Sequence, residues 1–235
     1  DDIMLKFEPG DVTVQGRFRY YDRLSQVQGA NAVKVRLLER DGGGNSLLDE
    51  VITQNPGGDF SFPNRMNWDM DDNDPNLSNR RLDLLVCFVL ENANFKVTYM
   101  SGSPYTWCAT TQDNVHMGTV TFDQVLPFGW VNLEAMWIFQ DLRWTREYYL
   151  GHTSPQSAPG FLTAHWEKGV EGENVAGSHF WAGPPDPHVF IADSSIRSSD
   201  TVVHEIGHHV MWNKTGQWLW YEYGCWDHLL FSQES

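Results

Sequence analysis

The hydrophobic pattern of this chain changes period once, and that change limits the fold more than any other feature. Up to about residue 123, apolar and polar residues alternate in short runs separated by turn residues. The run 12–22, VTVQGRFRYYD, places Val12, Val14, Phe18 and Tyr20 on one face, as a half-buried strand does. Turn signals recur at intervals of about ten residues, which predicts an antiparallel β-sandwich as a first domain over residues 1–123.

Other runs in this half support the sandwich. The run 82–92, LDLLVCFVLEN, is apolar on both faces, as expected of a central strand covered on both sides. The run 49–62, DEVITQNPGGDFSF, is typical of two strands joined by an Asn-Pro-Gly-Gly turn. Further strands are expected within 31–40, 95–102 and 116–122.

After residue 123 the pattern becomes helical. Residues 132–151, NLEAMWIFQDLRWTREYYLG, predict a buried helix with Asn132 at its start and Gly151 at its end. Two strands are expected within 161–169 and 188–195, followed by a second helix. The fold class is therefore α+β, with a second domain over residues 124–235.

The second helix carries the segment most informative about function, SSDTVVHEIGHHVMW, residues 198–212. Ser198, Ser199 or Asp200 would cap this helix. His204 and His208 are four residues apart, so a helix directs both imidazoles from one face toward one Zn²⁺ ion.

Glu205 lies between the two histidines and would act as general base and then general acid. A bound zinc lowers the pKa of water from about 15.7 to about 7, which supplies the nucleophile for hydrolysis. Gly207 would let another element approach the helix closely. Two other interpretations remain open: a solvated helix with incidental histidines, and a zinc site that is inactive or purely structural.

A zinc enzyme of this kind needs a third protein ligand. The sequence offers Glu222, Asp227, His228 and Glu234 after the motif. His209 points about 100° away around the helix and is a poor choice. Five more histidines have no motif spacing and are interpreted as ordinary polar residues: His116, His152, His165, His179 and His188. The strand from His188 to Ala192 is expected to line the cleft and to pair with an extended substrate.

Together these stretches resemble secreted, gluzincin-like bacterial and fungal metallopeptidases, in which a transthyretin-like or carboxypeptidase-regulatory-like sandwich precedes a zincin-like domain. The resemblance rests on RFRYYDR with NAVKVRLLERD, GGDFSF, AMWIFQDLRWTREYY, VVHEIGHHVMW and GCWDHLLFSQES. It implies zinc-dependent peptide-bond hydrolysis, with a Glu on a helix after the C-x-x-H segment as third ligand. It therefore also implies that the chain is cut after Ser235 and that Cys225 has lost a disulfide partner.

Charge and composition narrow the partners. The net charge of −15 argues against nucleic acid and against anionic membrane surfaces. The sequence has no run of 18 apolar residues, so it predicts no membrane-spanning helix. Of the cysteines, Cys87 and Cys108 form either a bridge or two buried thiols. We expect a secreted protein that acts on protein or peptide substrates.

An acidic loop and the exposed parts of the sandwich support two further hypotheses, a Ca²⁺ site and a non-enzymatic role. The loop 69–76 holds Asp69, Asp71, Asp72 and Asp74, so it is either a Ca²⁺ site or a solvated acidic turn. The alternative to a peptidase is an extracellular structural or adhesive protein that keeps an inactive peptidase-like fold. Such a protein would self-associate through sandwich edges or exposed aromatic residues.

Overall fold

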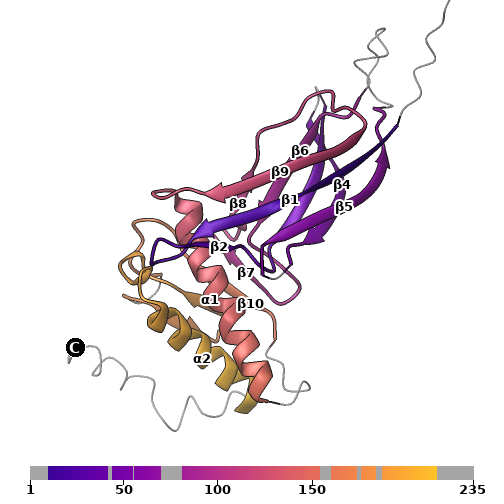
Figure 1. The fold of residues 1–235 in the computed structure, drawn as a ribbon. Coiled ribbons are helices and arrows are strands. Elements are labelled where there is room, and N and C mark those ends of the chain that lie inside the picture. The colour runs from indigo at the N-terminus through magenta and orange to yellow at the C-terminus, as the bar shows by residue number, and fades with distance from the viewer. Residues whose placement is uncertain are drawn as a thin grey trace, which may run out of the picture.

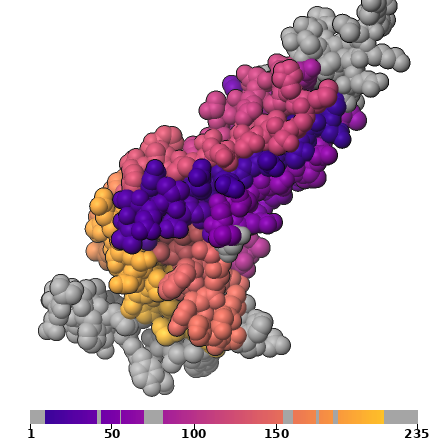
Figure 2. All heavy atoms as spheres, in the orientation of Figure 1, coloured from indigo at the N-terminus to yellow at the C-terminus, as the bar shows by residue number. Residues whose placement is uncertain are grey.

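A computed structural model describes residues 10–41, 44–54, 56–69, 81–153, 160–173, 176–183 and 187–215. This part of the chain is rich in strands and includes two α-helices, consistent with the α+β class (Figure 1). The molecule is elongated, with the first-half strands toward one end and the second helix toward the other (Figure 2).

The first sheet is built around β1 (Asp11–Tyr21), which is the alternating run that the sequence predicts as a half-buried strand. β2 (Val27–Gly29) and β5 (Asp59–Met66) pair with β1 antiparallel, and β9 (Gly118–Leu126) pairs with it in parallel along nearly its whole length. The predicted face is buried as expected. The prediction of a purely antiparallel sandwich is wrong at β9. Other strands lie between β1 and β9 in the sequence, and such a crossover connection allows the two strands to pair in parallel.

The second sheet has the order β4-β3-β6-β8 and is antiparallel throughout. Its strands are β3 (Lys34–Asp41), β4 (Gly44–Ile52), β6 (Leu84–Val89) and β8 (Thr106–Cys108). Every residue of β6 is buried, which confirms its central position. Cys87 of β6 and Cys108 of β8 are directly opposite and form a disulfide, so the bridged alternative holds.

Aromatic side chains join these two sheets face to face. The rings of Phe18 in β1 and Phe88 in β6 stack with centroids 3.9 Å apart, and Phe60 in β5 meets Phe88 edge-on at 5.7 Å. Burial of each such ring contributes about 2–3 kcal/mol, so this contact is a main source of cohesion between the sheets.

The third sheet has the order β11-β12-β10-β7. Its strands are β7 (Phe95–Thr98), β10 (Leu162–His165), β11 (His179–Trp181) and β12 (His188–Phe190). β7, β10 and β12 run parallel, and β11 is antiparallel to β12. β7 comes from residues 1–123 yet pairs with β10 from the second half. The boundary at residue 123 stays a prediction.

Two helices complete the described part of the second half: α1 (Val131–His152) and α2 (Ser199–Thr215), with a short 3-10 turn, η3 (Asp193–Ser195), just before α2. The N-cap of α1 lies two residues before the cap-like Asn132 that the sequence predicts. Trp130 takes the position expected of Asn132, and it makes no capping side-chain hydrogen bond. The helix forms nonetheless because residues 135–142 are all buried, and tertiary packing outweighs a missing cap.

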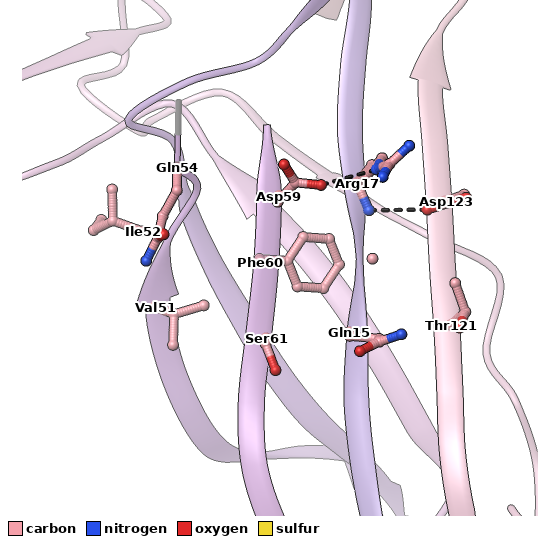
Figure 3. A pocket seen from close by; sticks show the side chains of 11 residues that line it. Gln15, Arg17, Val51, Ile52, Gln54, Asp59, Phe60, Ser61, Thr121 and Asp123 are labelled. Carbon is pink, nitrogen blue, oxygen red and sulfur yellow. Dashed lines mark hydrogen bonds and ion pairs between the residues drawn. The ribbon is translucent and has the colours of Figure 1, made fainter. Parts of the chain in front are cut away.

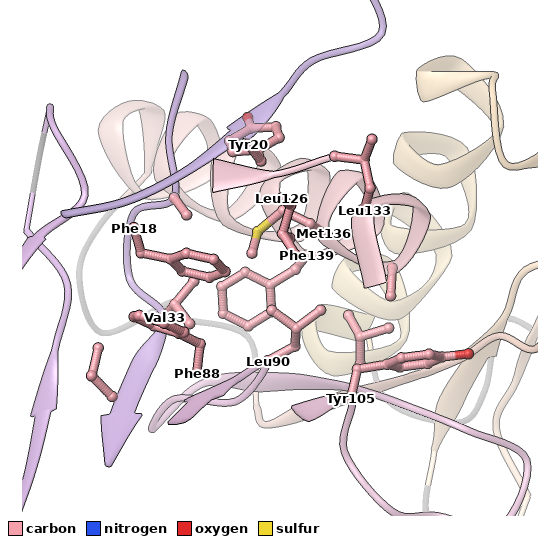
Figure 4. Packing of buried hydrophobic residues seen from close by; sticks show 14 of the residues in the cluster. Phe18, Tyr20, Val33, Phe88, Leu90, Tyr105, Leu126, Leu133, Met136 and Phe139 are labelled. Carbon is pink, nitrogen blue, oxygen red and sulfur yellow. The ribbon is translucent and has the colours of Figure 1, made fainter. Parts of the chain in front are cut away.

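One hydrophobic core runs from the sandwich to α1 (Figure 4). Leu133, Met136 and Phe139 of α1 lie beside Leu126 of β9 and Leu90, and all are buried. The prediction of a buried helix over 132–151 is therefore confirmed for residues 135–142. The sequence analysis did not identify three short strands, β2, β8 and β11, because three residues are too few to show a period.

Candidate metal and peptidase site

Ser198 determines where α2 begins. Its hydroxyl accepts hydrogen bonds from the Thr201 backbone N–H at 3.3 Å and from the Thr201 hydroxyl at 3.0 Å. Of the three residues proposed as caps, Ser198 has this role, since a capping side chain bonds the amide three residues on.

His204 and His208 converge from one face of α2. Their Nε2 atoms are 3.1 Å apart, and their rings meet edge-to-face with centroids 4.7 Å apart. His204 is exposed and His208 half-buried, so solvent reaches the pair. Two nitrogens bound to one tetrahedral zinc at about 2.0–2.1 Å would be about 3.3 Å apart, so the observed separation fits a zinc ion.

Glu205 turns away from solvent toward the third sheet. It is 7% exposed, and the backbone N–H of Phe180 in β11 donates a hydrogen bond to its carboxylate. Burial raises the pKa of the Glu205 carboxyl to about 7, and the hydrogen bond from Phe180 opposes this rise. The carboxylate is therefore held between the helix and the edge of the sheet.

His209 does not join the histidine pair. It is 2% exposed, and its ring contacts that of Phe180 with centroids 5.8 Å apart. Burial, with a smaller contribution from the charge of Arg146, lowers the pKa of His209 to about 4. The His209 ring therefore packs against β11, and among the described residues it belongs to no cluster of metal-binding groups.

The third ligand is not among the described residues. Within that part of the chain, no third His, Cys, Asp or Glu group lies close enough to join His204 and His208. Glu222, Asp227, His228 and Glu234 all lie outside the described residues, as do Cys225 and, apart from Asp69, the acidic residues proposed for calcium.

Gly207 does not have the role expected of it. A Cβ added at this position would meet no described atom within 4 Å. No described element approaches the helix here, because Gly207 faces away from the third sheet, on which Glu205 and Ile206 are buried.

The strand next to the site is β11 and not β12. β12 pairs with β10 on one side and β11 on the other, so its backbone cannot add a peptide, and the prediction for His188–Ala192 is wrong. β11 ends the sheet order among the described strands, and its Phe180 contacts Glu205. The aromatic run HFW just before a proline-rich loop was the only sequence signal for this strand.

An ion-pair network positions the start of α2. Arg23, in the turn after β1, donates two hydrogen bonds to Asp141 of α1, at 2.7 and 3.1 Å. The hydroxyl of Ser199 donates to the same carboxylate at 2.7 Å, and Arg23 also donates to the Ile196 carbonyl at 3.1 Å. The network thus connects the sandwich, α1 and α2.

Comparison with known proteins shows that part of the chain is similar to a known domain. Residues 150–235 match the model described as the Mycolysin C-terminal domain. The matched segment includes His204, Glu205 and His208, and it relates the chain to secreted metallopeptidases. The match covers less than half of the chain, and it does not itself show zinc binding or hydrolysis.

Other comparisons add little. No curated protein matches the chain. Among solved structures, a 9R-lipoxygenase from Cyanothece PCC8801 is 13% identical over 63% of this chain, with a TM-score of 0.32. The match spans 25% of the lipoxygenase chain, and so low a score supports no conclusion. In the described residues, no helix is long and apolar enough to cross a membrane.

A concave surface lies on the sandwich, away from α2 (Figure 3). It is an open hollow of about 870 Å³ along β1, β5 and β9. The Arg17 and Asp59 side chains in this hollow form an ion pair, with Arg17 Nε 2.8 Å from Asp59 Oδ1. The Asp123 carboxylate accepts a hydrogen bond from the backbone N–H of Arg17 at 3.0 Å. None of its lining residues belongs to α2 or to the third sheet.

Proposed function

We propose that the chain is a zinc-dependent peptidase in which His204 and His208 bind the metal and Glu205 transfers protons. The observation that carries the proposal is the convergence of the His204 and His208 Nε2 atoms, which are 3.1 Å apart on α2. The match of residues 150–235 to the Mycolysin C-terminal domain supports only the broader association with a secreted metallopeptidase.

The exposed histidines and the buried Glu205 would have different roles in the reaction. The imidazoles of His204 and His208 would hold Zn²⁺ at the surface of α2, where substrate has access. A bound zinc would supply a Lewis acid that polarises the scissile carbonyl and makes water more acidic. Glu205 would accept a proton from the attacking water and pass it to the leaving amine.

The neighbouring strand suggests how a substrate is oriented. β11 is the end strand of its sheet among the described residues, and its Phe180 is bonded to Glu205. An extended peptide that added to this edge would have its backbone aligned beside the proton-transfer group. The substrate class that fits is an unstructured protein or peptide segment.

Glu205→Gln tests the proposal with little change in shape. It should lower cleavage of fluorogenic unstructured peptides by about 10²–10⁴-fold and leave zinc content unchanged, because the base is lost and the ligands remain. His204→Ala should remove the zinc bound by this pair. His152→Ala, an exposed histidine at the end of α1, is the matched control and should change neither.

Two results would overturn the proposal. One is unchanged cleavage by folded Glu205→Gln. The other is a folded His204→Ala/His208→Ala variant that, with zinc in excess, keeps the zinc content of the wild-type chain. The second result would favour the structural or adhesive alternative.

A further inference from the structure

A second cluster of metal-binding groups lies in the third sheet. His165 ends β10, His188 begins β12, and Glu173 lies in the chain between β10 and β11. His188 Nε2 is 2.8 Å from one oxygen of Glu173, and His165 Nδ1 is 3.6 Å from the other. One ligand atom from each residue lies within 4.8 Å of the other two.

The cluster faces away from α2. Side chains alternate along a strand, and Thr163 pairs with His188, so Thr163, His165 and His188 share one face of the sheet. Leu162 lies on the other face, where it lines a small cavity with Ile206 and His209 of α2. The cluster and the α2 pair therefore occupy opposite faces of one sheet.

The two imidazoles both approach the Glu173 carboxylate, His188 through Nε2 and His165 through Nδ1. Their rings stack with centroids 4.4 Å apart at an interplanar angle of 11°, so binding one ion through both nitrogens requires one ring to turn out of the stack. His165 Nδ1 is buried, and its partner among the described residues is the Glu173 carboxylate, which at 3.6 Å is too far for a normal hydrogen bond. A buried nitrogen without a normal hydrogen bond is costly in a folded protein, and a cation between the three groups would remove that cost.

The turn that carries Glu173 is itself anchored. The carboxylate of Glu171 accepts hydrogen bonds from the backbone N–H of Ser194 at 3.0 Å and from its hydroxyl at 2.6 Å. The Gly177 backbone N–H donates to the Glu171 carbonyl at 2.8 Å. These bonds hold the turn against the segment after β12, and so hold Glu173 beside the two histidines.

We propose that His165, Glu173 and His188 bind a divalent transition-metal ion of the zinc class, at a site separate from the α2 pair. Two imidazoles and one carboxylate suit zinc, cobalt or nickel, whereas Ca²⁺ and Mg²⁺ prefer oxygen ligands throughout. The ion would join β10, β12 and the Glu173 turn, and would stabilise the sheet against which α2 lies.

Metal stoichiometry in the full chain tests this site independently of peptidase activity. The His204→Ala/His208→Ala double variant lacks the α2 pair, and it should still bind one Co²⁺ per chain with visible d–d absorption. Added metal should raise its melting temperature, because the ion binds only the folded state. Glu173→Gln in this background should weaken Co²⁺ binding about 100-fold or more, since even partners outside the ligand shell contribute 10–100-fold.

His179→Ala is the matched control, because His179 is a half-buried histidine of the same sheet that is not in the cluster. It should leave Co²⁺ binding unchanged. A folded double variant that binds no Co²⁺ would overturn the proposal, as would binding that survives Glu173→Gln and His165→Ala together. If the double variant instead has the same zinc content as wild type, the α2 proposal fails and the cluster stands.

Discussion

His204 and His208 share one helix, whereas His165, Glu173 and His188 come from two strands and a turn. The first pair is brought together by a spacing of four residues. The second group depends on the parallel register of β10 and β12, in which Thr163 is opposite His188. The α2 pair is open to solvent at His204, and the sheet cluster is more enclosed, with His188 only 8% exposed.

The difference in exposure between the two sites is consistent with a catalytic role for the α2 pair and a structural role for the sheet cluster. An exposed pair on a helix beside an edge strand leaves room for a substrate, as catalytic metal sites do. An enclosed group that connects separate segments is suited to a structural role. It also means that the two sites should fail for different reasons, and variants can separate them.

The largest effect is expected from Gly207→Pro. Proline in the middle of α2 removes a backbone hydrogen bond and clashes with the preceding turn, at a cost of about 3 kcal/mol or more. The spacing of His204 and His208 is then lost, and their metal with it. Elemental analysis should show one metal fewer per chain, with the sheet cluster still loaded. Loss of both metals from a folded chain would mean that the cluster depends on α2.

Arg23→Ala should come next. The Arg23 and Asp141 side chains are only 21% and 12% exposed, and removing the cation leaves a mostly buried carboxylate unpaired. The cost in unfolding free energy should be about 3–5 kcal/mol, as measured by denaturant titration. The α2 pair should lose metal affinity more than the cluster does. Arg17→Ala is the control, because its pair with Asp59 is exposed and should contribute at most about 1 kcal/mol.

Removing the disulfide should affect stability but neither metal site. Cys87 and Cys108 are 21 residues apart, and the chain-entropy estimate for closing such a loop is about 3 kcal/mol. The bridge lies in the second sheet, which contains none of the proposed ligands. A Cys87→Ala/Cys108→Ala variant should therefore melt at a lower temperature and bind the same number of metal ions. A changed stoichiometry would show that the sandwich controls the sites.

The smallest effect is expected from Gly207→Ala. The added methyl group meets open space, and alanine is favoured over glycine inside a helix by about 1 kcal/mol. Thermal unfolding should shift upward slightly, with both metal sites intact. A destabilised variant would indicate that part of the chain outside the described residues lies against this face of α2.

The sequence predicted the long periodic elements well. The buried faces of β1 and α1 followed from residues such as Phe18 and Met136, because burial imposes the period of each element on the sequence. It missed β11, whose three residues show no period, and it therefore predicted peptide pairing at β12, which is paired with a strand on each side. It also treated His165 and His188 as ordinary polar residues, since 22 positions of intervening chain hide a contact made through strand register.

By itself, the sequence determined the α2 pair, because a helix converts a spacing of four residues into a shared face without help from the rest of the fold. Only the tertiary structure decided that Glu205 is buried against Phe180, that Arg23 positions the start of α2, and that Glu173 meets two distant histidines. Each of these contacts joins separate segments. Such contacts depend on how sheets and helices pack, and packing leaves no fixed spacing in the chain.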